Sequence, residues 1–392
     1  MRLRTAIGRG VRGGIAGVAM VLAFSAVPWP AVADVPAGGH GSVVSTRPLT
    51  ADPGIPGARN YLVSYRSVDV HGQPVEVSGT LAVPQGQPPA GGWPLISWAH
   101  GTTGVADVCA PSRDTGPDYL SHDYTSLVRG VQAKWVAAGY ALAQTDYQGL
   151  GTDGAHGYLI GTAEQRAVAD FALAAHDIDP SVGTRWVAIG HSQGGQAAVF
   201  ADAQAQDWVP ELQLLGAVAL APASHLGPAV EAAKVAATSG GAQLPGNAAF
   251  LPLLIRGAQT VAEIDPARFL TPKALALLPQ ADDRCIGQLR GDDSWGGLRA
   301  GEVFTRDADI KALTRVLNDN DPSSLTFTTP LLVLQGRSDT TVAPQGTDAM
   351  VAQQRSSGQP VNYRNYPGID HRGVLDASFD DALVWVNARF GR

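Results

Sequence analysis

Cysteine is scarce in this chain of 392 residues, which contains only Cys109 and Cys285 and no C-x-x-C pair. Metal sites that depend on closely spaced cysteines are therefore excluded. In an oxidising compartment two cysteines usually form a disulfide, and two unpaired buried thiols are the alternative.

Basic residues are also few, with 28 Lys and Arg against 35 Asp and Glu and a formal net charge of −7. A surface that binds a nucleic acid duplex needs clustered Lys and Arg, and no such cluster occurs beyond the first residues of the chain. We therefore expect no nucleic-acid partner. Hydrophobic residues make up 45% of the chain, which is typical of a globular protein with a large core.

No apolar run reaches the roughly 20 residues that a membrane-spanning helix requires. The run nearest to that length, residues 15–27, follows four arginines and precedes the small residues of Ala31-Val32-Ala33. This pattern predicts a secretory signal peptide over residues 1–33. A membrane anchor is the alternative, but the run is too short for one. We therefore expect a secreted, extracellular protein that begins near Asp34 and has no stable membrane insertion.

The remaining pattern indicates an α/β fold. A flexible leader is expected over residues 34–57, and alternating residues over 61–83 predict antiparallel strands. From Trp93 onward, short apolar runs alternate with helical segments, which is typical of a parallel sheet covered on both faces. The runs expected to form strands are 94–98, 140–144, 186–189, 215–220 and 331–334, and the helices are expected at 125–138, 163–176 and 193–205.

The alternation breaks down between residues 226 and 327. This segment contains Ala- and Leu-rich stretches interrupted by Gly and Pro, without a clear strand pattern. Because a structureless insertion of this length is uncommon inside a compact domain, we expect a helical cap or lid over 226–327. The core is then built from 58–225 and 328–392.

The motif "GHSQGG", residues 190–195, contains a serine between glycines. A β-branched apolar run, "RWVAIG", precedes it, and the helix-forming run "QAAVFADAQAQ" follows it. Strand, tight turn and helix are the surroundings of a nucleophile elbow, so Ser192 is the expected nucleophile. The backbone N–H of Gln193, at the start of the helix, is the expected oxyanion donor.

A serine nucleophile needs a base and an orienting carboxylate. Asp339 follows the apolar run in "LLVLQGRSDTTVAP", and His371 follows the last run in "VNYRNYPGIDHRGV". The chain order Ser192, Asp339, His371 is the order of an α/β-hydrolase triad. Alternatives with a weaker case are Asp370 as the acid, His191, His176 or His225 as the base, and Asp146 as a site residue.

A second oxyanion donor is expected in the loop after an earlier strand. The stretch "ISWAHGTTG" turns at His100 and Gly101, so Thr102 or Thr103 can present its N–H to Ser192, with Thr102 preferred. A simple glycine turn is the alternative.

These motifs together resemble the secretory lipase family of α/β-hydrolases, found in fungi and actinomycetes. The resemblance covers residues 61–392 and rests on "AHGTTG", "CAPS" at 109–112, "DYQGLG" at 146–151, "GHSQGG", "GRSDTTVAP" and His371. It implies carboxylic ester hydrolysis and a helical cap inserted late in the sheet. It also implies a disulfide between the oxyanion loop and that cap, which would join Cys109 to Cys285.

We therefore expect a secreted serine carboxylic ester hydrolase, of the lipase or esterase type, that works through an acyl-enzyme. Its substrate is a small-molecule or lipid ester, and transient contact with a lipid interface is compatible with the sequence. The triad chemistry requires no metal and no organic cofactor. The alternatives are a serine peptidase, a polyester or aryl esterase, and a non-catalytic binding protein. Acyl-chain length, interfacial activation and oligomeric state are left open.

Overall fold

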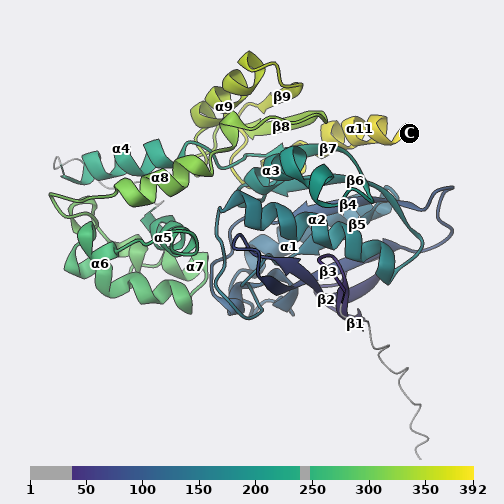
Figure 1. Ribbon diagram of the computed structural model, residues 1–392, viewed down its shortest axis with the longest axis horizontal. Helices are drawn as coiled ribbons and strands as arrows, with labels where there is room; N and C mark the ends of the chain where they lie inside the picture. The colour runs from purple at the N-terminus through teal and green to yellow at the C-terminus, as the bar shows by residue number, and fades with distance from the viewer. Residues whose placement is uncertain (1–37, 239–247) are drawn as a thin grey trace, which may run out of the picture. The chain divides into compact units, whose positions relative to one another are not determined.

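The computed structural model describes residues 38–238 and 248–392, so the predicted signal peptide lies outside the described residues (Figure 1). The sheet has nine strands in the order β1-β2-β3-β5-β4-β6-β7-β8-β9. In chain order the strands are β1 Val43–Leu49, β2 Ala58–Val68, β3 Pro74–Pro84, β4 Trp93–Ala99, β5 Ala141–Thr145, β6 Val182–His191, β7 Gln213–Leu220, β8 Leu331–Gly336 and β9 Val361–Tyr366.

The sheet is parallel from β5 to β9, and β1, β2 and β3 extend it as antiparallel strands. The central strands are buried on both faces because their side chains alternate between two hydrophobic clusters. In β4, for example, Leu95 packs in one cluster and Ile96 in the other. The predicted α/β class is confirmed.

Helices cover both faces of this sheet. Three of them contribute to the cluster that contains Leu95, namely α2 Gly161–Ile178, α3 Gln193–Trp208 and α9 Pro344–Ser356. Three others contribute to the cluster that contains Ile96, namely α1 His122–Ala137, α10 Val374–Ala377 and α11 Phe379–Phe390. Both layers therefore exclude water from the strands whose ends carry the polar loops.

A flexible leader was expected over 34–57, and the described part of that segment, residues 38–57, is instead partly ordered. Residues Val43–Leu49 form β1, which pairs with β2 along the edge of the sheet. Pro48 is tolerated there because an edge strand leaves some N–H positions unpaired. His40 is also tied down, because its Nδ1 lies 2.7 Å from Oδ1 of Asp170 and its ring stacks on Trp208.

The described residues between β7 and β8 form helices and short 3₁₀ turns, which Figure 1 shows gathered in one group. A hydrophobic cluster that includes Leu253, Trp295 and Leu313 fills the group, and it continues into the core through Tyr158, Leu159 and Ile160. Across its described residues no strand forms, and the one β-bridge joins Leu270 to Phe304. The helices are α4 Leu226–Thr238, α5 Leu251–Gln259, α6 Pro272–Leu277, α7 Ile286–Leu289 and α8 Lys311–Asp319. We refer to residues 226–327 as the helical insertion.

Within residues 38–238 and 248–392, every helix is too short or too polar to span a membrane.

Candidate active site

Ser192 occupies a strained turn between β6 and α3. Its φ of 60° and ψ of −116° lie in a region that non-glycine residues rarely adopt. Two glycines permit the turn: a Cβ on Gly190 would lie 1.9 Å from the carbonyl oxygen of Gly194, and one on Gly194 would lie 1.9 Å from that of Ala99. The glycines of "GHSQGG" are therefore required by close backbone approach, and Ser192 is held at the end of a buried strand.

The three residues expected to form a triad are brought together. His371 Nε2 lies 2.9 Å from Ser192 Oγ, and His371 Nδ1 lies 2.7 Å from Asp339 Oδ2. Ser192 follows β6, Asp339 follows β8 and His371 follows β9, so three strand ends supply the cluster. In this geometry the imidazole can accept the serine proton while the carboxylate fixes its orientation.

The carboxylate of Asp339 is itself fixed by four hydrogen bonds. Its Oδ1 accepts the backbone N–H groups of Thr341 and Val342, each at 2.8 Å. Its Oδ2 accepts Gln335 Nε2–H at 3.1 Å as well as the His371 bond. The neighbouring acid, Asp370, instead accepts the Gly373 N–H at 2.7 Å. The structure thus places Asp339, and not Asp370, against the imidazole.

His191 was expected to be a packing residue, and it is fully buried behind the triad. Its Nε2 lies 2.8 Å from the carbonyl oxygen of His371, and its Nδ1 lies 3.0 Å from the hydroxyl of Tyr124. The same hydroxyl accepts the Gly101 N–H at 2.7 Å. Burial, followed by the nearby His371, lowers the pKa of His191 well below its usual value, so a neutral ring bridges the loops of Gly101 and His371.

The remaining alternatives have structural partners. His176 Nδ1 lies 2.7 Å from the carbonyl oxygen of Val182. The backbone N–H of His225, a residue with φ of 54°, donates to Asp321. Asp146 accepts hydrogen bonds from Ser78 Oγ and Ser112 N, at 2.7 and 2.9 Å.

Both expected oxyanion donors lie beside Ser192. Gln193 is the first residue of α3, and Thr102 lines the same cavities as Ser192. Across the described part of the chain, neither backbone N–H donates to another protein group. Thr103, the alternative, is fully buried, and its carbonyl oxygen accepts the Ile286 N–H at 2.8 Å. The position of Thr102 therefore favours it over Thr103.

The side chain of Gln193 belongs to a buried polar group that no motif in the sequence predicts. Its Nε2 lies 2.7 Å from Glu164 Oε1 and 3.0 Å from His156 Nε2. Burial raises the pKa of Glu164 to about 8 and lowers that of His156 to about 4. Both groups are therefore uncharged near pH 7. Only their tertiary neighbours distinguish them from ordinary residues of α2 and its preceding loop.

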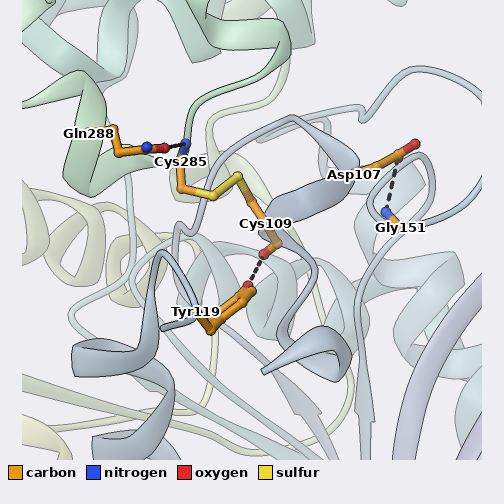
Figure 2. The surroundings of a disulfide bond; sticks show 6 residues. All are labelled: Asp107, Cys109, Tyr119, Gly151, Cys285 and Gln288. Atoms are coloured by element: carbon orange, nitrogen blue, oxygen red, sulfur yellow. Dashed lines mark hydrogen bonds between the residues drawn. A yellow bond between two sulfur atoms is a disulfide. The ribbon is translucent and has the colours of Figure 1, made fainter. Parts of the chain in front are cut away.

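A disulfide joins Cys109 to Cys285, with 5.5 Å between the Cα atoms (Figure 2). Cys109 lies just after the Thr102 loop, and Cys285 immediately precedes α7 of the helical insertion. Tyr119 donates its hydroxyl to the Cys109 carbonyl at 2.6 Å. The pairing implied by the family resemblance is present, and with the Ile286–Thr103 bond it ties the insertion to the loop beside Ser192.

Two cavities meet at the nucleophile. One, of about 490 Å³, is mainly apolar, and its lining includes Ser192, Leu226, Phe250, Leu254 and Val342. The other, of about 230 Å³, is polar, and its lining includes Ser192, Arg290, Asp370, His371 and Arg372. Thr102, Phe250 and Thr341 line both. A larger cleft of about 890 Å³, beside Asp107 and Arg256, contains no triad residue.

Among the described residues no group of three or more His, Cys, Asp or Glu side chains is arranged to hold a metal ion.

Comparison with known proteins agrees with this architecture. A family model described as "Serine aminopeptidase, S33" matches residues 121–377. No curated protein matches the chain at a significant level. The esterase LipA of Xanthomonas oryzae, described as rice cell wall degrading, superposes in a ligand-bound form with a TM-score of 0.69 at 17% identity, covering 90% of this chain and 98% of that one.

Two further solved structures are similar. Candida antarctica lipase A in its closed state has a TM-score of 0.70 at 18% identity, covering 90% of this chain and 83% of that one. A putative hydrolase from Legionella pneumophila has a TM-score of 0.65 at 17% identity, covering 86% and 96%. At these identities the likeness establishes the fold, and the predicted α/β-hydrolase fold is confirmed.

Proposed function

The chain belongs to the α/β-hydrolase family described as serine aminopeptidase S33, and we propose that it is a secreted carboxylic ester hydrolase of the lipase and esterase type. The observation that carries the proposal is the hydrogen-bonded series Ser192, His371 and Asp339, in which Ser192 lines an apolar cavity. Its likeness to LipA and to lipase A, which are named an esterase and a lipase, supports the same substrate class.

In the proposed mechanism, Ser192 Oγ attacks the ester carbonyl while His371 Nε2 takes its proton. The N–H groups of Gln193 and Thr102 stabilise the tetrahedral oxyanion. His371 then donates the proton to the departing alcohol oxygen, which leaves an acyl-serine. A water molecule, deprotonated by His371, attacks that acyl group, and its collapse releases the carboxylic acid and restores Ser192.

The two cavities are proposed to hold different parts of the ester. His371 must protonate the leaving oxygen, so the alcohol lies on the side of the histidine. His371 lines the polar cavity, whereas the described lining of the apolar cavity does not include it. The apolar cavity is therefore assigned to the acyl chain and the polar cavity to the alcohol.

The domain organisation expected from the sequence is retained as part of this proposal. Residues 58–225 and 328–392 form the catalytic core, and 226–327 cap the acyl cavity. Leu226, Phe250 and Leu254 of the insertion line that cavity, which supports this role. Residues 1–33 are proposed to be removed on export, which N-terminal sequencing of the exported protein would test.

The family description also names aminopeptidases, which must bind the cationic amino terminus of their substrate. The described lining of the apolar cavity contains no acidic side chain to receive such a cation, and in the polar cavity one carboxylate, Asp370, lies among two arginines. A buried ammonium without a carboxylate partner is strongly disfavoured. These observations favour ester hydrolysis.

The test is a substrate panel on the purified protein: p-nitrophenyl esters of increasing chain length, triglycerides and aminoacyl p-nitroanilides. Hydrolysis of the esters, with negligible turnover of the anilides, is expected. The Ser192→Ala variant, prepared in parallel, controls for contaminating esterases. Hydrolysis of the anilides alone would replace the proposal with a peptidase function.

A further inference from the structure

The polar cavity beside His371 carries two arginines that the ester hydrolysis mechanism does not use. Arg290 follows α7 of the helical insertion, and Arg372 follows His371 directly in the chain. Both line the cavity assigned above to the leaving alcohol. The chain as a whole has a net charge of −7, whereas the surroundings of His371 contain two positively charged guanidinium groups.

Arg372 is held in a fixed position by acidic and aromatic neighbours. Its Nη1 lies 2.7 Å from Asp123 Oδ2, and its guanidinium carbon lies 5.5 Å from the centre of the Tyr124 ring. Because the Arg372 side chain is 40% exposed and that of Asp123 is 70% exposed, solvent screens this ion pair and Asp123 neutralises Arg372 only in part. The role of Arg372 at the cavity is to place a planar, preorganised donor group at the rim.

Arg290 has a different environment. Its guanidinium carbon lies 5.1 Å above the ring of Phe250, which lines both cavities. Within residues 38–238 and 248–392 no carboxylate lies within ion-pair distance of it. Arg290 is exposed overall. Partial desolvation of its guanidinium, followed by repulsion from Arg372, lowers its pKa, against smaller opposing effects of Tyr158 and Asp123. An anion between the two arginines would relieve this repulsion.

One acidic side chain, Asp370, also lines the polar cavity. Its Oδ1 accepts the Gly373 N–H and so holds the loop after His371. The lining of the polar cavity thus carries two guanidinium groups against one carboxylate, because Asp123, the partner of Arg372, is not part of it. The lining therefore favours a ligand group of negative charge.

Resting on the proposed ester hydrolysis, we propose that the leaving alcohol carries an anionic group, a carboxylate or a phosphate, which Arg290 and Arg372 bind. The ester R–CO–O–R′ reacts with water to give the acid and the alcohol, and the anion is part of R′. Arg290 is a specificity-determining residue, because it contacts the alcohol portion at a distance from the bond that breaks. Carboxylate and phosphate both suit a guanidinium fork.

The experiment compares matched esters that differ in charge on the leaving group. The butanoate ester of 4-nitrophenol is compared with the butanoate ester of 5-hydroxy-2-nitrobenzoate, which adds a carboxylate to the same chromophore. A second pair, a monoacylglycerol and its 3-phosphate, distinguishes phosphate from carboxylate. The measured quantity is the ratio of kcat/KM for the anionic ester to that for its neutral partner.

We expect the native protein to prefer the anionic member of at least one pair. In Arg290→Gln that ratio should fall about three- to ten-fold, as suits a partly exposed charge contact. Raising the ionic strength should reduce the native preference by screening. The matched control is Arg284→Gln, an arginine of the same insertion that is paired with Asp293 and should leave the ratio unchanged.

Equal kcat/KM for charged and neutral esters in the native protein would overturn the inference while leaving ester hydrolysis intact. A preference for the anionic ester that persists in a folded Arg290→Gln variant would also overturn it. Thermal unfolding of each variant shows whether it is folded. If neither ester of a pair is hydrolysed, the failure belongs to the proposed function and the inference falls with it.

Discussion

The side chain of Gln193, the residue next to the nucleophile, is anchored by a 2.7 Å hydrogen bond from its Nε2 to Oε1 of Glu164. The same Oε1 accepts the backbone N–H of Leu159 at 2.9 Å. Leu159 lines the apolar cavity, so one buried carboxyl connects a wall of that cavity to the start of α3. We infer that this bond fixes the backbone N–H of Gln193 in the orientation that an oxyanion would require.

The first prediction concerns the pH dependence of folding. Burial raises the pKa of Glu164 from 4.5 to about 8, so the folded protein keeps a proton there that the unfolded chain has released. The stability from Glu164 is fully present below about pH 4.5 and is lost as the pH rises through about 8. The native protein should lose free energy of unfolding relative to Glu164→Gln, by at most about 1.4 kcal/mol per pH unit.

Urea unfolding of both proteins at pH 5, 7 and 9 measures this difference. Other groups that titrate, including His156, are common to the two proteins, so their contributions largely cancel. Parallel stability curves across this range would show that Glu164 is ionised in the folded state.

The second prediction is that Ser192→Ala abolishes ester hydrolysis, because loss of a triad nucleophile costs on the order of 10⁶-fold in turnover. The fold should survive, because alanine is smaller and Ser192 is already nearly buried. Initial rates with a p-nitrophenyl ester and labelling by a fluorophosphonate probe provide the measurement. Ser356→Ala, at the exposed end of α9, is the matched control and should keep both properties. More than a few per cent residual activity would contradict the assignment.

The third prediction separates the two adjacent acids. In Asp339→Asn, an amide replaces a carboxylate. That carboxylate accepts hydrogen bonds from two backbone N–H groups and also from the side-chain atoms Gln335 Nε2 and His371 Nδ1. If the amide NH₂ group faces His371, the imidazole loses its orienting acceptor, and if it faces the N–H groups of Thr341 and Val342, it repels the donors that hold the loop, so both orientations disturb the imidazole. By analogy with other serine hydrolases we expect kcat to fall about 10³- to 10⁴-fold. Asp370→Asn should change kcat by less than about ten-fold, and the reverse order of effects would reassign the acid.

Much of the fold could be predicted from the sequence because buried parallel strands leave unbroken apolar runs. The runs at 94–98 and 186–189 fall inside β4 and β6 for this reason. The strand β1 was missed because four of its seven residues, Ser45 to Pro48, are polar or proline, so its sequence resembles a loop. It forms a strand only because it pairs with β2, and that pairing depends on the tertiary structure.

The same distinction between local sequence signals and tertiary contacts applies to the site residues. Ser192, Asp339 and His371 could be proposed because each follows an apolar strand and is flanked by turn residues. Glu164 and Tyr124 could not, since both lie within helices and reach the site only through folding. The position of Arg290 could not be predicted either, because nothing in its local sequence indicates that it lines a cavity together with His371.

The last prediction concerns the disulfide, which closes a loop of 176 residues between Cys109 and Cys285. Confinement of the unfolded chain by so long a loop is expected to stabilise the fold by about 5 kcal/mol in the chain-entropy view. The Cys109→Ala, Cys285→Ala double variant should therefore unfold at a lower urea concentration than the native protein. Non-reducing peptide mapping of the native protein should recover the cross-linked peptide.

Loss of the disulfide should also lower the catalytic activity, because Cys285 lies beside a contact to the Thr102 loop. Ile286, next to Cys285, donates to the carbonyl of Thr103, and Thr103 follows the proposed oxyanion donor Thr102. Without the disulfide, the insertion and this loop are joined less firmly, so the Thr102 N–H is less well oriented. We therefore expect kcat to fall by a larger factor than KM rises. The kinetics must be measured at a temperature where the double variant is still folded. If kcat is unchanged there while stability drops, the disulfide serves the fold alone and does not position the oxyanion loop.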